Sequence, residues 1–278
     1  MSGRRGARQP ARFLLAATTI AILAFLVAPI VVVLPLSLSS GELLTLPVPG
    51  YSLRWYRDFF TSDQWLLATR NSFVVGIATA VVATVLGTLG ALGVFLGRFR
   101  GKALLVGLLS TPMVVPVVVT AAAVYFAFAL VGLNNTLTGL VLAHTVLSVP
   151  YVLITVLATL QTFDRNLLKA AATLGAPPHV AFVRVVLPSI APGVATGALF
   201  AFATSFDELI VALFVASPAQ FTLPRQMFAG LREFLSPTIA AAAVLLIGCS
   251  LVLLALNEWV RARATARTRS TAAAAARG

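Results

Sequence analysis

The chain has 278 residues, of which 59% are hydrophobic and only 10% are charged, and its mean hydropathy is +0.99. Because about a quarter of the residues of an ordinary soluble domain are charged, this composition excludes a water-soluble globular domain. The net charge of +12 would indicate nucleic-acid binding in a soluble chain, so the basic residues must be placed relative to the apolar segments. The single cysteine, Cys249, offers neither a disulfide framework nor a cysteine-based metal site.

Six apolar segments are long enough to cross a bilayer, which takes about 20 helical residues each. We expect these spans at residues 12–36, 66–96, 103–131, 137–160, 191–216 and 238–259. The first span follows a cluster of arginines as a signal peptide would, but its apolar part is about twice the usual length, so we expect a retained anchor. The chain is therefore expected to be an all-α membrane protein. It would have a basic N-terminus at 1–11, a six-helix transmembrane domain at 12–260 and a basic tail at 261–278.

The distribution of basic residues predicts the orientation in the membrane. If the spans alternate in direction, most of the 20 Lys and Arg residues fall on the side of the N-terminus. The positive-inside rule then places both termini in the cytoplasm. We expect the basic tail to lie against the inner surface of the lipid bilayer rather than to bind nucleic acid.

Other features predict how the helices bend and pack. The outer connection at 37–65 mixes aromatic and charged residues in the manner of a short amphipathic helix in the membrane interface. Pro112 and Pro116 in the third span, and Pro150 in the fourth, each remove a backbone hydrogen bond and are tolerated at a bend or a cavity. Small residues four positions apart allow close helix packing. These pairs are Ala83 with Gly87, Gly93 with Gly97, and Gly193 with Gly197.

Residues 161–188, between the fourth and fifth spans, form a cytoplasmic segment with two helix-like halves. An apolar stripe at helical spacing marks the first half, and a short apolar segment around Arg184 forms the second. Gly175 to Pro178 separate them. The stripe consists of Leu167, Leu168, Ala171 and Leu174. We expect a compact two-helix projection on the inner face.

This segment resembles the loop of ABC importer permeases that is named after its Glu-Ala-Ala motif. In that loop a glycine, an isoleucine and a Leu-Pro pair follow the motif at fixed spacing. Lys169 stands where the glutamate would be, which reverses the charge. The residues that match the other positions are Ala170, Ala171, Gly175, Val185, Leu187 and Pro188. We expect Gly175 to end the first helix with a positive φ and Pro188 to end the second.

The resemblance implies the six-helix, MetI-like transmembrane domain of such permeases. The loop would be a coupling helix held in a cleft of a separate ATPase subunit. It also implies a second permease subunit, identical or homologous, an extracytoplasmic substrate-binding protein and a location in the bacterial cytoplasmic membrane. Residues 97–102 lack the spacing of a phosphate-binding loop, so ATP and Mg would be bound by the ATPase. We expect no catalytic residue, cofactor or metal in this chain.

Further segments resemble the permeases of spermidine/putrescine importers in particular. These segments are residues 51–60, 70–72, 205–208 and 222–241. The resemblance implies that the solute is a polyamine or a similar small cation. Another amine, a ferric compound or a phosphonate remains an alternative, because the substrate-binding protein is absent from this sequence.

Apart from Glu258 at the end of the sixth span, Asp207 and Glu208 are the only carboxylates within any predicted span, where an ionised group costs at least a few kcal/mol unless it meets water or a partner. Helical rise places Asp207 in the outer third of the bilayer. Neighbouring helical positions point about 100° apart, so we expect one of the pair to face the pathway. We favour Asp207, which lies close to Thr204. A polar pair at the outer mouth or a helix-packing hydrogen bond is the alternative interpretation.

Two other functions are compatible with a helical membrane protein. An intramembrane enzyme would need catalytic groups that converge, and none can be assembled here. His144 and His179 lack the company of other metal ligands and are expected to make local hydrogen bonds. An ion-coupled secondary transporter is commonly built from two similar halves, and no internal repeat is evident.

Overall fold

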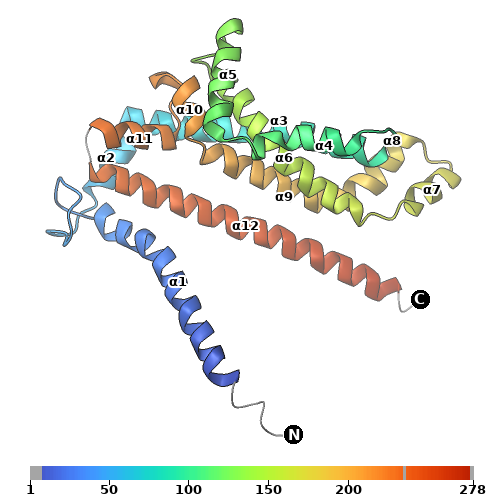
Figure 1. The fold of residues 1–278 in the computed structure, drawn as a ribbon, viewed down its shortest axis with the longest axis horizontal. Coiled ribbons are helices and arrows are strands. Elements are labelled where there is room, and N and C mark those ends of the chain that lie inside the picture. The colour runs from blue at the N-terminus through green and yellow to red at the C-terminus, as the bar shows by residue number, and fades with distance from the viewer. Residues whose placement is uncertain (1–7, 234–235, 276–278) are drawn as a thin grey trace. The chain divides into compact units, whose positions relative to one another are not determined.

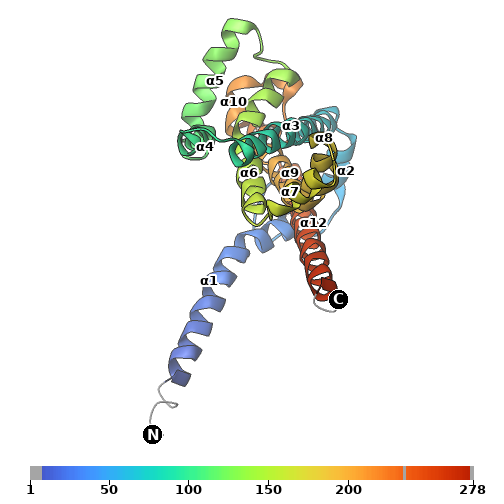
Figure 2. The same cartoon turned by 90° about the vertical axis from the view of Figure 1, so that its right-hand side faces the viewer.

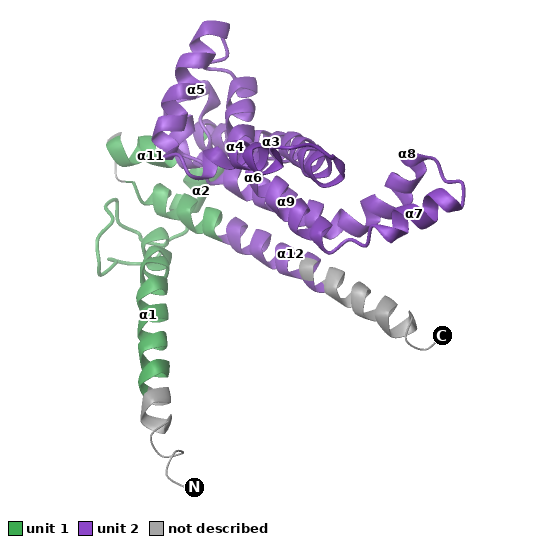
Figure 3. Ribbon diagram, turned by 45° about the vertical axis from the view of Figure 1, so that its right-hand side comes forward, with its two compact units in different colours: residues 1–62, 227–247 green, residues 63–226, 248–278 purple. Residues whose placement is uncertain are grey.

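The computed structural model describes residues 8–233 and 236–275, so the outermost residues of both predicted basic ends lie outside the described part. All regular structure in the described ranges is helical, which confirms the all-α prediction. The chain forms two compact units (Figure 3). Unit 1 comprises residues 1–62 and 227–247, and unit 2 comprises residues 63–226 and 248–278.

Unit 1 contains one long helix, α1, one short helix, α2, and parts of two further helices. α1 spans Arg8–Ser37 and α2 spans Arg54–Thr61. α11 (Leu223–Glu233) and α12 (Pro237–Ala275) each begin in one unit and end in the other. α11 lies in an outer connection that the sequence did not predict to be helical.

Unit 2 contains the long helices α3 (Asp63–Leu96), α6 (Leu137–Gln161) and α9 (Leu187–Phe206). Its shorter elements are α4 (Lys102–Ser110), η1 (Thr111–Met113), α5 (Val117–Val131), α7 (Asn166–Thr173), α8 (Pro178–Ala181), η2 (Phe182–Val186), α10 (Ile210–Val215) and η3 (Pro218–Gln220). Figures 1 and 2 show α7 and α8 at one end of the α3, α6 and α9 bundle, and α5 and α10 toward the other end.

Five helices of the described chain are long and apolar enough to cross a membrane, and a bent pair of helices supplies a sixth candidate. This pair replaces the predicted third span: Lys102–Met113 and Val117–Val131 meet at 96°. Of the two possibilities expected at Pro112 and Pro116, a bend or a cavity, the structure shows a sharp bend. Pro116 is the N-cap of α5, a position at which a backbone N–H has no partner within the helix, so its absence costs no hydrogen bond. Pro112 lies in the η1 turn just before the break.

Small residues let α3, α6 and α9 pack pairwise, as predicted (Figure 1). A Cβ atom on Gly87 would lie 2.6 Å from the Cβ atom of Val152 in α6. A Cβ atom on Gly197 would lie 2.7 Å from the Thr155 hydroxyl, and one on Gly193 would clash with Thr159. The third predicted pair behaves differently, because Gly93 has no neighbour within 4 Å of its Cβ position.

Gly87→Ala is expected to lower the stability of the bundle by about 1–3 kcal/mol, because the α6 backbone would have to move to accommodate one methyl group. The midpoint of thermal unfolding of the purified protein in detergent measures this loss. Gly93→Ala in the same helix is the matched control, since the added methyl group meets open space and removes backbone freedom from the unfolded chain. Equal midpoints for the two variants would contradict close α3–α6 packing at Gly87.

The predicted amphipathic helix of the outer connection is α2. Trp55 and Phe59 are buried in unit 1, whereas Arg57 and Asp58 are exposed. The indole Nε1 of Trp55 donates a hydrogen bond to the carbonyl of Ser39 at 2.7 Å, which joins α2 to the end of α1. The amphipathic character is thus confirmed, and a position in the membrane interface stays a prediction.

Polar side chains near the start of α3 hold the segment that follows α10. The Asn71 amide donates to the carbonyls of Ala219 and Phe221 at 3.1 and 3.0 Å. The Ser72 hydroxyl accepts a hydrogen bond from the backbone N–H of Leu223 at 2.7 Å. Both side chains are buried, and these bonds satisfy backbone groups that no helix pairs.

Candidate translocation cavity and coupling segment

The predicted fifth span ends ten residues before its expected end, because α9 stops at Phe206 and α10 begins at Ile210. Asp207 and Glu208 therefore lie in a break between two helices, and the prediction that they occupy adjacent positions of one continuous helix is wrong. The physical reason is the Glu208 side chain. Its carboxylate accepts hydrogen bonds from the backbone N–H groups of Val211 and Ala212 and so satisfies donors at the start of α10.

Glu208 is held firmly by these contacts. Its oxygens lie 2.9 and 3.0 Å from the Val211 nitrogen, and one of them lies 3.3 Å from the Ala212 nitrogen. The residue is only 8% exposed. A buried carboxylate is tolerated when backbone donors surround it, so a structural role accounts for much of Glu208.

His144 in α6 contacts both the end of α9 and the break that follows it. Its Nδ1 atom lies 2.8 Å from the Ser205 hydroxyl in α9, and its Nε2 atom lies 3.6 Å from a carboxylate oxygen of Glu208. The imidazole is fully buried. The Nδ1 contact confirms the expectation that His144 is a hydrogen-bonding residue, whereas the Nε2 atom is too far from Glu208 for a hydrogen bond. In the described residues no group of three or more His, Cys, Asp or Glu side chains is placed to hold a metal ion.

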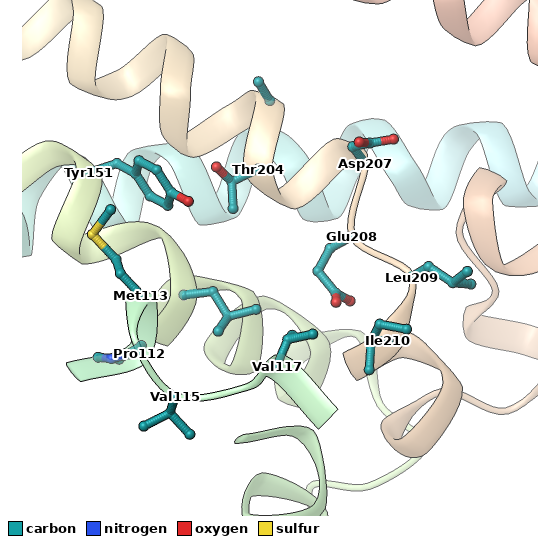
Figure 4. Close-up of a pocket in the computed structure, with 12 residues that line it drawn as sticks. Pro112, Met113, Val115, Val117, Tyr151, Thr204, Asp207, Glu208, Leu209 and Ile210 are labelled. Carbon is teal, nitrogen blue, oxygen red and sulfur yellow. The ribbon is translucent and has the colours of Figure 1, made fainter. Parts of the chain in front are cut away.

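Asp207 differs from its neighbour because it is exposed. Figure 4 shows the Glu208 carboxylate pointing among the labelled cavity residues, whereas the Asp207 carboxylate points away from them. Both residues border a cavity of about 650 Å³, together with Thr204, Tyr151 and the proline-rich bend between α4 and α5. The structure thus brings the three predicted pathway residues to one cavity, and it leaves the Asp207 carboxylate free of the backbone bonds that occupy Glu208.

Tyr151 is a cavity residue that the sequence did not single out. Its hydroxyl and that of Thr204 point toward each other in Figure 4. An aromatic residue in an apolar helix carries no functional signal of its own, although Pro150 just before it marks a position where a bend or a cavity was expected. The aromatic ring also stacks on Phe200 of α9, with ring centroids 6.5 Å apart.

At the opposite end of the bundle, the predicted coupling segment begins with α7 and turns at Gly175. The φ of Gly175 is +77°, which confirms the predicted left-handed conformation after the first helix. The second half differs from the prediction, because Pro188 does not end it. Residues Pro178–Phe206 run as one helix through the π-helical segment η2, and Pro188 lies in the first turn of α9. The ring is accommodated there because η2 shifts the local hydrogen-bond ladder.

The residues that match the permease loop lie on an accessible segment. Lys169 and Ala170 are exposed, and Lys169 Nζ donates to the Asn166 amide oxygen at 3.4 Å. Val185 is half-buried, and Leu187 and Pro188 are exposed. Of the predicted apolar stripe, Leu168 packs against the core, whereas Leu174 is 87% exposed. Exposed apolar side chains on a small projection suit contact with another protein.

The family model described as "Binding-protein-dependent transport system inner membrane component" matches residues 83–266. The chain belongs to this family. As a member of the binding-protein-dependent transport family it is a multi-pass protein of the inner membrane and an ABC importer permease. The matched residues include the coupling segment and the α9–α10 break.

Two relatives of this permease align with it over most of their length. It is 30% identical over 240 residues to the spermidine/putrescine transport system permease protein PotC of Escherichia coli (strain K12), covering 86% of this chain and 90% of PotC. It is 32% identical over 231 residues to the putrescine transport system permease protein PotI of the same strain, covering 81% of this chain and 82% of PotI. Both are transport permeases by name.

A solved structure shares the fold. One chain of a bacterial ABC transporter involved in the import of the acidic polysaccharide alginate matches with a TM-score of 0.68 at 14% identity, covering 91% of this chain and 96% of that chain. At this identity the similarity concerns the fold alone. It confirms the predicted permease architecture.

Proposed function

We propose that this chain is one permease half of an ATP-driven importer for spermidine, putrescine or a similar small cation. The observation that carries the proposal is the similarity to PotC and PotI over more than four fifths of the chain. Asp207 and Glu208 both border the 650 Å³ cavity, and two acidic residues at its wall support a cationic solute, because carboxylates attract an ammonium group.

The remaining subunits follow from the same assignment. Two ATPase subunits bind ATP and Mg and hydrolyse ATP. A second permease, identical or homologous, completes the pathway, and an extracytoplasmic binding protein delivers the solute. Residues 161–188 are the coupling loop that an ATPase cleft receives, with both termini of the chain in the cytoplasm. The accessible surface of Lys169, Ala170 and Leu174 supports this contact.

Within the pathway, Asp207 and Thr204 contact the passing solute. Glu208 stabilises the break between α9 and α10 beside which these two residues lie. This division of roles is supported by the hydrogen bonds from Val211 and Ala212 to Glu208. A solute ammonium group that reached Glu208 would have to compete with these backbone donors.

Reconstitution tests the proposal. The permease is assembled with its ATPase, its partner permease and its binding protein in liposomes, and uptake of labelled spermidine and putrescine is compared with uptake of a neutral sugar. We expect polyamine uptake that requires ATP. Uptake driven by an ion gradient without ATP would instead support a secondary transporter. Uptake of the sugar alone would replace the proposed solute.

A further inference from the structure

Arg165 is the N-cap residue of α7, and its side chain reaches the end of a different helix. One guanidinium nitrogen donates a hydrogen bond to the backbone carbonyl of Phe95 at 2.6 Å. The guanidinium carbon also lies 4.2 Å from the centre of the Phe95 ring. Phe163 completes the cluster, since its ring meets that of Phe95 edge-on at 6.3 Å.

The position of Phe95 gives this contact its meaning. Phe95 is the penultimate residue of α3, which ends at Leu96. The last carbonyl groups of a helix lack partners within the helix, and the helix dipole makes this end negative. The cationic guanidinium of Arg165 makes a cation–π contact with the Phe95 ring and donates a hydrogen bond to the Phe95 carbonyl. These two interactions anchor the start of the coupling segment to the end of α3.

The rest of the segment is packed less closely against that helix end. A cavity of about 290 Å³ lies between Leu96 at the end of α3 and the coupling segment, whose wall includes Leu168, Ala172 and Phe182. Within the described residues, the side-chain hydrogen bonds of α7 itself are local, from Lys169 to Asn166 and from Thr173 to Lys169. Arg165 thus provides a polar connection beside a space in which α7 can shift.

We infer that Arg165 is a positioning residue for energy coupling, which transmits displacement of α7 to the end of α3. The inference depends on the proposed function, in which the ATPase moves this segment. α3 packs against both α6 and α9, so force applied at Phe95 reaches the helices that border the translocation cavity. The helix α8–η2–α9 connects the segment to the cavity by a second route, and Arg165 makes the two routes move together.

The test compares ATP hydrolysis with solute uptake in the reconstituted importer. For Arg165→Gln we expect the complex to assemble and to hydrolyse ATP, while uptake per ATP hydrolysed falls about fivefold or more, the range typical of coupling between sites. Arg165→Lys keeps the charge but loses the planar guanidinium, so it should recover part of the uptake. Arg100→Gln, at an exposed position on the loop after α3, is the matched control and should leave the ratio unchanged.

A double-mutant cycle with Phe95→Leu isolates the ring contact, because the backbone carbonyl of residue 95 keeps its hydrogen bond with Arg165 in that variant. The part of the Arg165→Gln effect that Phe95→Leu already removes is the contribution of the aromatic ring. An unchanged uptake ratio for Arg165→Gln would overturn the inference. Loss of the ATPase subunit from the purified Arg165→Gln complex would place Arg165 in the subunit interface, and this result would also overturn the inference. Failure of the proposed function is distinguishable, because the unsubstituted permease would then show no ATP-dependent uptake.

Discussion

Asp207→Asn is expected to lower the rate of polyamine uptake about tenfold, equivalent to about 1.4 kcal/mol, because the neutral amide no longer attracts an ammonium group. The Asp207 carboxylate is exposed and has no role in holding α10, so membrane insertion and assembly with the ATPase should be unchanged. Uptake by reconstituted complexes measures the loss, and copurification of the ATPase measures assembly.

Two matched variants sharpen this result. Glu208→Gln should lower the thermal stability of the purified protein, because an amide replaces the charged acceptor of the Val211 and Ala212 N–H groups. Asp58→Asn removes an exposed carboxylate from α2 and should leave uptake unchanged. Normal uptake by Asp207→Asn would remove this carboxylate from the pathway, and the polar pair would then be structural.

Gly175→Val is expected to abolish copurification of the ATPase subunit with this permease. At a φ of +77° a β-branched side chain is strongly disfavoured, so the turn between α7 and α8 would adopt another conformation and displace the coupling loop. Gly175→Asn should retain binding, because asparagine tolerates this region, as Asn135 does here with a φ of 59°.

Gly132→Val controls for backbone strain as such. Gly132 has a φ of +71° at the C-cap of α5, and like Gly175 it has open space around its Cβ position. Both substitutions therefore introduce similar strain, but only the one at Gly175 lies in the coupling segment. Equal loss of ATPase from both variants would show that general destabilisation, and not the loop conformation, controls assembly.

The sequence predicted the features that depend on local patterns. Runs of apolar residues located the helices, because a bilayer span requires about 20 of them. The left-handed turn at Gly175 followed from the spacing of the loop motif, and the amphipathic α2 followed from its alternation of aromatic and charged residues. Each of these signals is complete within a short stretch of chain.

The errors arose where distant or side-chain contacts decide the backbone. No glycine or proline lies between Phe206 and Val215, so the usual helix-ending residues are missing there. The hydrogen bonds that Glu208 accepts from residues three and four positions ahead appear only in the folded chain. The prolines of the third span indicated a bend but not its 96° angle. Pro188 looked like a helix terminator, and only the π-helical segment before it explains why the helix continues.

The continuous helix Pro178–Phe206 has 29 residues, so it is about 43 Å long at 1.5 Å per residue. If it rotates as a stiff rod about its coupling end, each degree of tilt displaces the far tip by about 0.8 Å, as follows from this length. Under the proposed roles, one end of the helix would be bound by the ATPase subunit, and Asp207 would follow directly after the other end. A swing of a few degrees would then suffice to change what the carboxylate meets, without any residue along the rod altering its own conformation.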